Sequence, residues 1–274
     1  MITKCPICPR GCMLEEGQTG FCRGRENKNG EIICSNYGKV TSIALDPIEK
    51  KPLSHFMPLR KILSVGSFGC NMRCPFCQNY RITMVGSDIE TTEISPAELA
   101  QKAVDEVEKG NVGVAYTYNE PFISYEYVRD CCIEVRKVGL VNVLVTNGYV
   151  CEQPLRELLP YVNAMNIDLK CFNEAFYKKL DGDFETVKRT ITIAQENCHV
   201  EVTALIIPGE NDSKEEMKNM SSWLSSLNPN IPLHISKFFP NYQWKHLAPT
   251  PEGTIYSLAE IALRKLSYVY MGNV

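Results

Sequence analysis

The chain has 274 residues, of which 44% are hydrophobic and 22% are charged, and its formal net charge is −3 at pH 7. These values are ordinary for a globular protein and argue against disorder or a coiled coil. The slightly acidic balance excludes the overall positive field that drives binding to phosphate backbones, so no nucleic-acid partner is expected. No apolar run approaches the ~20 residues of a membrane helix, and the start lacks the apolar region of a signal peptide. We therefore expect a cytoplasmic protein with no membrane partner.

Residues 1–60 contain an unusual group of cysteines in CPICPRGC and GFCRGR, namely Cys5, Cys8, Cys12 and Cys22. The cytosol keeps thiols reduced, so metal binding explains these cysteines better than disulfides do. Four thiolates within about twenty residues can close a site. Zinc and a 4Fe-4S cluster both fit, and the identity of the ligands does not separate them. The segment therefore predicts a small, Cys-rich, metal-binding module.

Residues 61–274 change to apolar, strand-like runs separated by helical stretches, which indicates βα units and a parallel sheet. A helix is expected from Ser95, because Pro96 suits its first position and Glu98 completes a capping box. A second helix is expected after Thr250 and Pro251. The fold class is α/β, a partial (open) TIM-like (β/α)6 barrel. The expected strands are 62–68, 112–118, 141–147, 164–170, 200–207, 232–239 and 268–272.

The first of these strands leads into the loop CNMRCPFC, which carries Cys70, Cys74 and Cys77. Three thiolates can hold three corners of a 4Fe-4S cluster and leave one iron free for another ligand. A structural zinc site prefers four ligands in closed geometry, so zinc fits this loop less well. The loop resembles that of the radical S-adenosylmethionine (SAM) superfamily, whose members also carry an aromatic residue before the last cysteine, here Phe76.

That resemblance implies that the amino and carboxylate groups of SAM bind the open iron. An electron from the cluster then splits the sulfonium to release a 5′-deoxyadenosyl radical, which abstracts a hydrogen atom. The implied cofactors are the 4Fe-4S cluster and SAM. The implied electron donor is a flavodoxin or ferredoxin, and the substrate, a protein or a small molecule, is left open.

Polar residues follow the later strands, at the edge where βα folds carry their chemistry. Asn119 and Glu120 end the second strand, where the family contacts the amino group of SAM. Thr203 lies on the fifth strand and His234 on the sixth, where each is a candidate for SAM binding. For His234 alone, a purely structural role is the stronger expectation.

The third strand ends in TNGY and the fourth in NIDLK, which supply Thr146, Asn147, Asp168 and Lys170. This pair resembles glycyl radical activating enzymes such as pyruvate formate-lyase activating enzymes, in which these strand ends bind parts of SAM. The resemblance suggests a protein glycyl residue as the substrate. Val145 stands where that relative has an acidic residue, which argues against a cation site here.

Other segments extend the resemblance to the radical SAM component of the AmmeMemoRadiSam system over nearly the whole chain. They are the N-terminal cysteines, DPIEKKPLSHFMP, GCNMRCPFCQN, YTYNEP, TNGY, DLK and HISKFFP. A different class of function remains open beside it. A metal-stabilised electron-transfer or zinc-binding module without SAM chemistry would also contain two groups of cysteines, but it would not need polar groups gathered at the strand ends.

Overall fold

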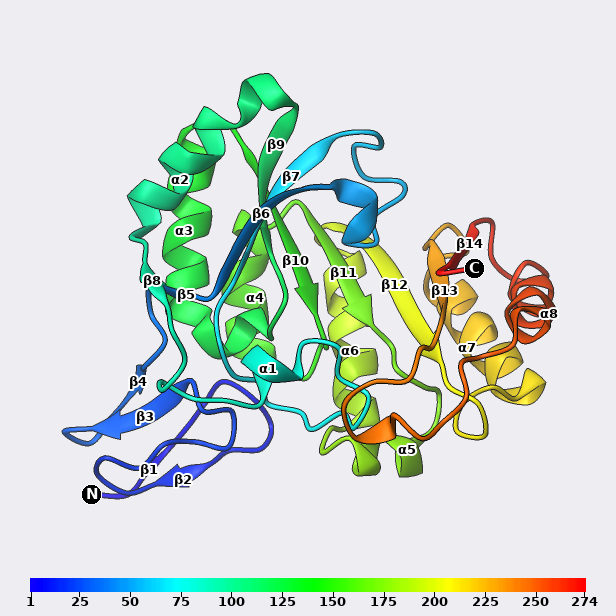
Figure 1. The fold of residues 1–274 in the computed structure, drawn as a ribbon, viewed down its shortest axis with the longest axis horizontal. Helices are drawn as coiled ribbons and strands as arrows, with labels where there is room; N and C mark the ends of the chain where they lie inside the picture. Colours follow the sequence, from blue (N-terminus) through cyan, green and yellow to red (C-terminus); the bar gives the residue numbers. More distant parts are fainter.

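The centre of the molecule is an eight-stranded sheet in the computed structural model, which describes residues 1–274 (Figure 1). The strand order is β14-β13-β12-β11-β10-β9-β7-β6. All neighbours are parallel except β6, which pairs antiparallel with β7. The strands are β6 (Ser42–Pro47), β7 (Lys61–Gly66), β9 (Asn111–Tyr116), β10 (Val141–Thr146), β11 (Ala164–Asp168), β12 (His199–Ile206), β13 (Leu233–Lys237) and β14 (Val269–Gly272).

Helices connect the parallel strands and cover the outside of the sheet (Figure 1). Helix α2 begins as expected: the Ser95 side chain accepts from the backbone N–H of Glu98, and the Glu98 carboxylate accepts from the N–H of Ser95. Ser213 caps α7 in a similar way. The helices are α1 (Tyr80–Thr83), α2 (Pro96–Asp105), α3 (Tyr125–Lys137), α4 (Glu152–Leu158), α5 (Glu174–Lys179), α6 (Phe184–Gln195), α7 (Lys214–Leu227) and α8 (Glu252–Ala262).

The sheet does not close, because β14 and β6 are its two edges and do not pair with each other. Apolar residues such as Val114, Leu144 and Ile167 are fully buried in the strands, as expected for a parallel sheet covered by helices. The structure confirms the expected α/β partial barrel and all seven of its strands.

The N-terminal segment forms short hairpins beside the carboxyl ends of the strands (Figure 1). The sequence predicts a module boundary at residue 60, and β6, which precedes that boundary, pairs with β7 in the barrel sheet. The segment SIALDP at residues 42–47 is strand-like, but it does not reveal its pairing partner. The separate hairpins therefore end near residue 40. Their strands are β1 (Thr3–Lys4), β2 (Met13–Leu14), β3 (Arg25–Lys28), β4 (Glu31–Cys34) and β5 (Lys39–Val40), and β5 pairs with β8 (Thr92–Glu93).

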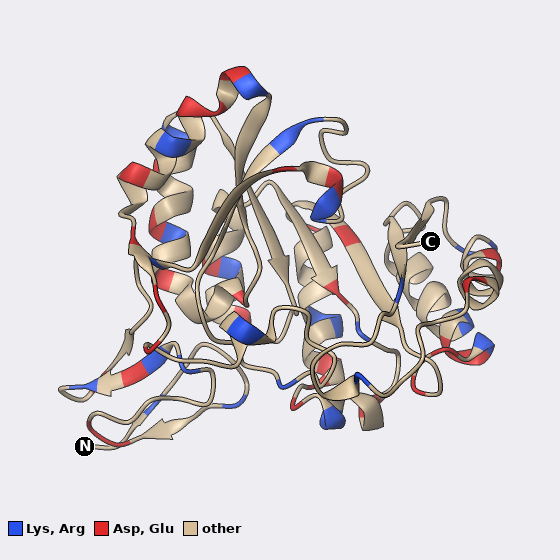
Figure 2. Ribbon diagram, in the orientation of Figure 1, with Lys and Arg blue, Asp and Glu red and all other residues tan.

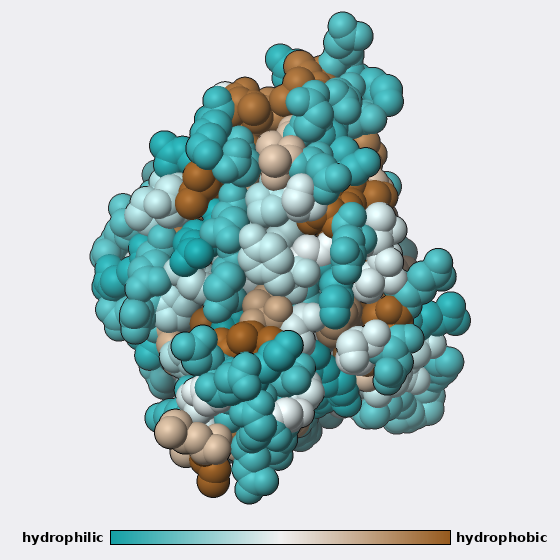
Figure 3. Space-filling view, turned by 90° about the vertical axis from the view of Figure 1, so that its left-hand side faces the viewer, coloured by the Kyte–Doolittle hydropathy of each residue, from teal (hydrophilic) through white to brown (hydrophobic).

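Charges of both signs are interspersed over the outer helices (Figure 2). The side that carries the N-terminal hairpins and α2 is largely hydrophilic, with hydrophobic residues in separate patches (Figure 3). None of the helices has the length and apolar character required to cross a bilayer.

Candidate functional site

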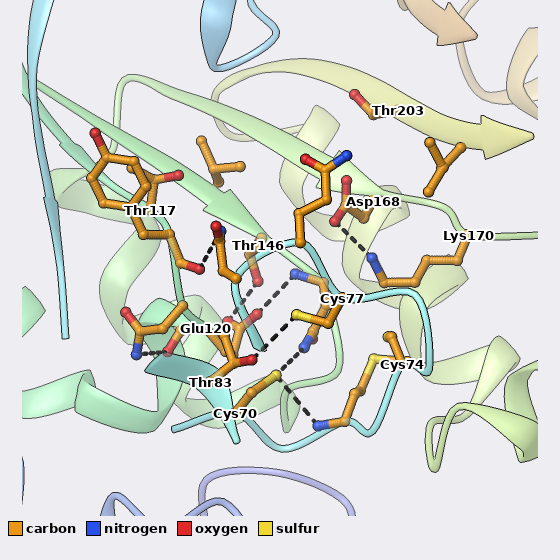
Figure 4. Close-up of a pocket in the computed structure, with 18 of the residues that line it drawn as sticks. Cys70, Cys74, Cys77, Thr83, Thr117, Glu120, Thr146, Asp168, Lys170 and Thr203 are labelled. Atoms are coloured by element: carbon orange, nitrogen blue, oxygen red, sulfur yellow. Dashed lines mark hydrogen bonds and ion pairs between the residues drawn. The ribbon is translucent and has the colours of Figure 1, made fainter. Parts of the chain in front are cut away.

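A cavity of about 300 Å³ lies at the carboxyl ends of the parallel strands. This is the edge at which such folds place their ligands, and the volume is at the lower end of ordinary small-molecule sites. The cavity gathers the three-cysteine loop and residues on or just after strands β9 to β14 (Figure 4). It is lined by Cys70, Met72, Cys74, Phe76, Cys77, Gln78, Asn79, Thr83, Thr117, Tyr118, Asn119, Glu120, Val145, Thr146, Asn147, Asp168, Lys170, Thr203, Leu205, Ser236 and Asn273.

The loop after β7 brings the thiols of Cys70, Cys74 and Cys77 to one wall of the cavity (Figure 4). Backbone and side-chain donors surround these sulfurs. The N–H of Met72 lies 3.5 Å from Cys70 Sγ, and Asn147 Nδ2 lies 3.6 Å from the same sulfur. Such donors stabilise thiolates and cluster sulfurs. The wall therefore suits a group that needs three soft ligands and keeps a face open to the cavity.

Glu120 is an almost fully buried carboxylate in the loop that follows β9. It accepts from Thr146 Oγ1 at 2.7 Å, from the backbone N–H of Asn147 at 2.8 Å and from that of Phe122 at 3.1 Å. Burial raises its pKa to about 7, although these three donors act in the opposite direction. A carboxylate in this position can accept a further hydrogen bond from an amino group in the cavity.

Asn119 lines the same cavity, but its side chain is used to hold the cysteine loop. Its Oδ1 accepts from the N–H of Ser67 at 2.9 Å, and its Nδ2 donates to the carbonyl of Phe68 at 3.2 Å. Asn147 holds the far side of that loop, because its Nδ2 donates to Asn71 Oδ1 at 2.9 Å. The strand ends after β9 and β10 thus fix the position of the three cysteines.

Asp168 and Lys170, which both line the cavity, form an ion pair with 2.8 Å between Lys170 Nζ and Asp168 Oδ2 (Figure 4). Burial acts against the charge on Lys170, but the negative charges of Asp168 and Cys74 together outweigh it, and the pKa of Lys170 is raised. Thr203, in register with Asp168 on the next strand, exchanges hydrogen bonds with Asn166. This wall offers a carboxylate, an ammonium and a hydroxyl.

Phe76 lines one side of the cavity and is backed by two aromatic rings outside the lining. Phe76, between Cys74 and Cys77, stacks on Phe176 of α5 with 6.4 Å between ring centroids and lies 5.4 Å from the ring of Trp244. Such a stack gives the cavity an apolar surface on which a flat ring system can pack.

His234 is not part of the cavity lining, contrary to its assignment as a SAM-binding candidate. Its ring is buried, and its Nε2 lies 2.6 Å from Oε2 of Glu201. Glu201 also accepts from the N–H groups of Ser54 and His55. The structural expectation for this histidine is the one that the contacts favour.

The N-terminal cysteines gather at a second, enclosed cavity on the hairpin side of the loop. Cys5, Cys8, Cys12 and Cys22 all line it, together with Arg25 and Asn71 among others. The four sulfurs surround this space and do not converge on a point: no three His, Cys, Asp or Glu side chains of the chain form a group that could hold one metal ion.

Some lining residues had no signal in the sequence. Thr83, in the short helix α1, places its Oγ1 3.2 Å from Cys77 Sγ. Ser236 of β13 and Asn273 near the C-terminus reach the cavity from the far edge of the sheet. Ser236 is the exception, because strand alternation indicates it as a lining residue; nothing in the sequence relates Thr83 or Asn273 to the cysteine loop.

Comparisons with known proteins agree with this geometry. An uncharacterised protein of Methanocaldococcus jannaschii is 41% identical over 276 residues, which cover 99% of this chain and 81% of that protein. The pyruvate formate-lyase 1-activating enzyme of Escherichia coli K12 is 25% identical over 161 residues, which cover 57% of this chain and 65% of that enzyme.

Solved structures share the fold. A domain of a pyruvate-formate lyase-activating enzyme from Bacteroides vulgatus matches with a TM-score of 0.51 at 20% identity, over 59% of this chain and 99% of that one. SuiB of Streptococcus suis, bound to its precursor peptide, matches with a TM-score of 0.59 at 12% identity, over 82% of this chain and 51% of that one. The family model of the radical SAM superfamily matches residues 64–221, more than half of the sequence. The chain therefore belongs to the radical SAM superfamily.

Proposed function

We propose that Cys70, Cys74 and Cys77 hold the 4Fe-4S cluster that the family implies, and that SAM occupies the adjoining cavity. The observation that carries this proposal is that three cysteines of one loop and the polar residues of several strand ends line a single cavity. The reduced cluster would supply the electron that splits SAM into methionine and a 5′-deoxyadenosyl radical. The three thiols leave one corner of such a cluster without a protein ligand, and that corner would receive the amino and carboxylate groups of SAM.

Residues on different walls of the cavity would bind different parts of SAM. Glu120 would accept a hydrogen bond from the amino group, because its carboxylate is held beside the cysteine loop by Thr146 and Asn147. Lys170 and Asp168 would bind the carboxylate and the ribose hydroxyls, since they present opposite charges to the cavity. Phe76 would pack against the adenine. Thr203 lies in register with Asp168 and would extend the polar wall.

The substrate would be a protein glycyl residue, from which the radical abstracts a hydrogen atom. This is supported by the similarity to pyruvate formate-lyase activating enzymes over more than half of this chain. The electron would come from a reduced flavodoxin or ferredoxin. A test supplies cellular protein that carries deuterium at the glycine α-carbon. Deuterium in 5′-deoxyadenosine is expected; transfer only from the small-molecule fraction would contradict a protein substrate.

The cluster site is tested by anaerobic assay of 5′-deoxyadenosine after dithionite reduction, with iron quantified in the same samples. The triple variant Cys70→Ala/Cys74→Ala/Cys77→Ala should lose about four irons and all nucleoside formation. Cys198→Ala is the matched control, because Cys198 is a partly buried thiol outside both cavities. It should keep both. Nucleoside formation by the triple variant would refute the assignment.

A further inference from the structure

The second cysteine group repeats the arrangement of the first, with its spacing reversed. Cys5, Cys8 and Cys12 span eight residues as CxxCxxxC, whereas Cys70, Cys74 and Cys77 span eight residues as CxxxCxxC. The N-terminal group has a fourth member, Cys22, and all four line one enclosed cavity. A group bound by four cysteines has no open corner, so this site suits electron transfer or structure and not the binding of SAM.

The arrangement of the four cysteines around one cavity favours a cluster over a single ion. A zinc ion draws four thiolates to about 2.3 Å from one point, whereas a 4Fe-4S cluster holds them around a larger body. The four N-terminal cysteines surround a cavity without forming a single-ion site, and the three cysteines of the radical SAM loop behave in the same way. The two groups share this feature, although the N-terminal cavity is much smaller, about 10 Å³ against about 300 Å³.

Two arginines with buried, unpartnered Nε atoms point to an anionic occupant with hydrogen-bond acceptors. Arg25 is 2% exposed and lines the cavity, and its Nε has no hydrogen-bond partner, although its other nitrogens bind Glu126. Arg10 also lines the cavity, and its buried Nε is equally unpartnered. A buried N–H without a partner costs about 1–3 kcal/mol. The thiolate and sulfide sulfurs of a cluster would supply acceptors to both.

The two sites are joined by direct contacts. The carbonyl of Cys22 accepts from the backbone N–H of Cys70 at 3.1 Å. Asn71 is fully buried, lines the N-terminal cavity and follows Cys70 directly in the chain. Gly69 makes this approach possible, because a Cβ there would lie 2.2 Å from the carbonyl oxygen of Cys22. One hydrogen bond therefore links a ligand of each site.

We propose that Cys5, Cys8, Cys12 and Cys22 bind a second 4Fe-4S cluster, which passes electrons to the cluster held by Cys70, Cys74 and Cys77. This proposal rests on the proposed function, since it assumes that the cluster held by Cys70, Cys74 and Cys77 cleaves SAM. A one-electron protein donor is oxidised as it reduces the N-terminal cluster. The N-terminal cluster is then reoxidised as it reduces the radical SAM cluster, and no bond or proton changes place in either step.

The occupant is tested on the full-length, anaerobically reconstituted protein. Wild type should contain about eight irons and no zinc. The triple variant Cys70→Ala/Cys74→Ala/Cys77→Ala should keep about four irons and give a reduced-cluster EPR signal that does not change when SAM is added. One zinc in place of these irons would overturn the inference. If wild-type protein that held this zinc still formed 5′-deoxyadenosine, the proposed function would stand. If it formed none, that result would count against the proposed function separately.

The electron-transfer role is tested with Cys5→Ala/Cys8→Ala, and Cys131→Ala/Cys198→Ala serves as the matched control. With reduced flavodoxin as the donor, nucleoside formation should fall at least tenfold in the first variant. With dithionite, a small reductant that reaches the cluster held by Cys70, Cys74 and Cys77 directly, it should stay within about twofold of wild type. An equal loss with both reductants would assign the N-terminal group a structural part only and overturn the relay, and so would full activity with both. The control should match wild type in each assay.

Discussion

At the scale of the residue, the site depends on polar groups that the fold holds away from water. Glu120 is 3% exposed and has three donors on its two carboxylate oxygens. Burial still dominates, so its pKa rises to about 7. The carboxylate thus carries a cost in the protein alone, and a bound amino group would reduce that cost.

Glu120→Gln should change how stability depends on pH in the cluster-free protein. Because the folded pKa is raised, the folded state keeps a proton that the unfolded state releases between about pH 4.5 and 7. The free energy of unfolding of wild type relative to Glu120→Gln should therefore fall by about 2–3 kcal/mol from pH 4 to pH 8. Anaerobic urea denaturation at both pH values measures it. A constant difference between the two proteins would show that the carboxylate ionises normally.

Gly69→Ala should separate the N-terminal hairpins from the cysteine loop. Gly69 has φ +85°, and an added Cβ would meet the carbonyl of Cys22. Gly139→Ala is the control, because Gly139 has φ +78° with open space around it. Both variants have the backbone strain, about 1 kcal/mol, but only Gly69→Ala has the clash and should lose at least 1–3 kcal/mol more. Thermal denaturation compares them, and equal losses would count against a tight contact.

At the scale of the element, two residues of the same strand have different roles. In β12, Thr203 lines the cavity, whereas Glu201, two residues earlier, is fully buried and receives His199, His234 and two backbone N–H groups. Alternation places both side chains on one face of the strand, about 6.6 Å apart along it. The Glu201 network fastens the segment before β7 to the barrel interior.

His234→Gln should lower stability and leave SAM binding unchanged. The variant weakens a hydrogen bond to a buried carboxylate, so the free energy of unfolding should fall by about 1–3 kcal/mol. The dissociation constant for SAM should stay within twofold of wild type. Thr203→Val, which changes the cavity wall, should instead weaken SAM binding several-fold with a smaller loss of stability. Isothermal titration and urea denaturation of both variants distinguish the two roles. A weakened SAM affinity in His234→Gln would show that His234 contributes to the SAM site.

The parallel strands and helix α2 could be predicted from the sequence because their signals are local. Apolar runs located all seven parallel strands, and the capping box located α2. Pairing is not local, so nothing in residues 42–47 indicated that β6 would join the barrel. The same reason explains His234: it lies in register with Thr203, but its ring is taken by Glu201. The contact of Thr83 with Cys77 depends on how α1 folds back, which no motif describes.

At the scale of the whole molecule, two cysteine sites meet at the junction of the N-terminal hairpins and the barrel. The spacing of the cysteines located both groups in the sequence. The strand ends around Cys70, Cys74 and Cys77 were found from their order in the chain. Their approach through Cys22 and Cys70 could not be predicted, because it requires the packing of two separate segments. The resemblance to the AmmeMemoRadiSam component stays a prediction.

Exposure to air should inactivate the protein. The cavity beside Cys77 is open to solvent, since this cysteine is only partly buried, and a cluster with an open corner is accessible to oxidants. Nucleoside formation should fall at least tenfold after aerobic incubation and return after anaerobic reconstitution with iron and sulfide. Full activity after prolonged aerobic handling would be inconsistent with an open-cornered cluster.

The central claim is that SAM binds the cluster held by Cys70, Cys74 and Cys77. The most direct measurement is electron–nuclear double resonance on the dithionite-reduced protein, with SAM that carries ¹⁵N in its amino group and ¹⁷O in its carboxylate. We expect hyperfine couplings from both labels in wild type and in Cys198→Ala, and none in Cys74→Ala. Absence of both couplings in a wild-type protein with its full iron content would contradict the account.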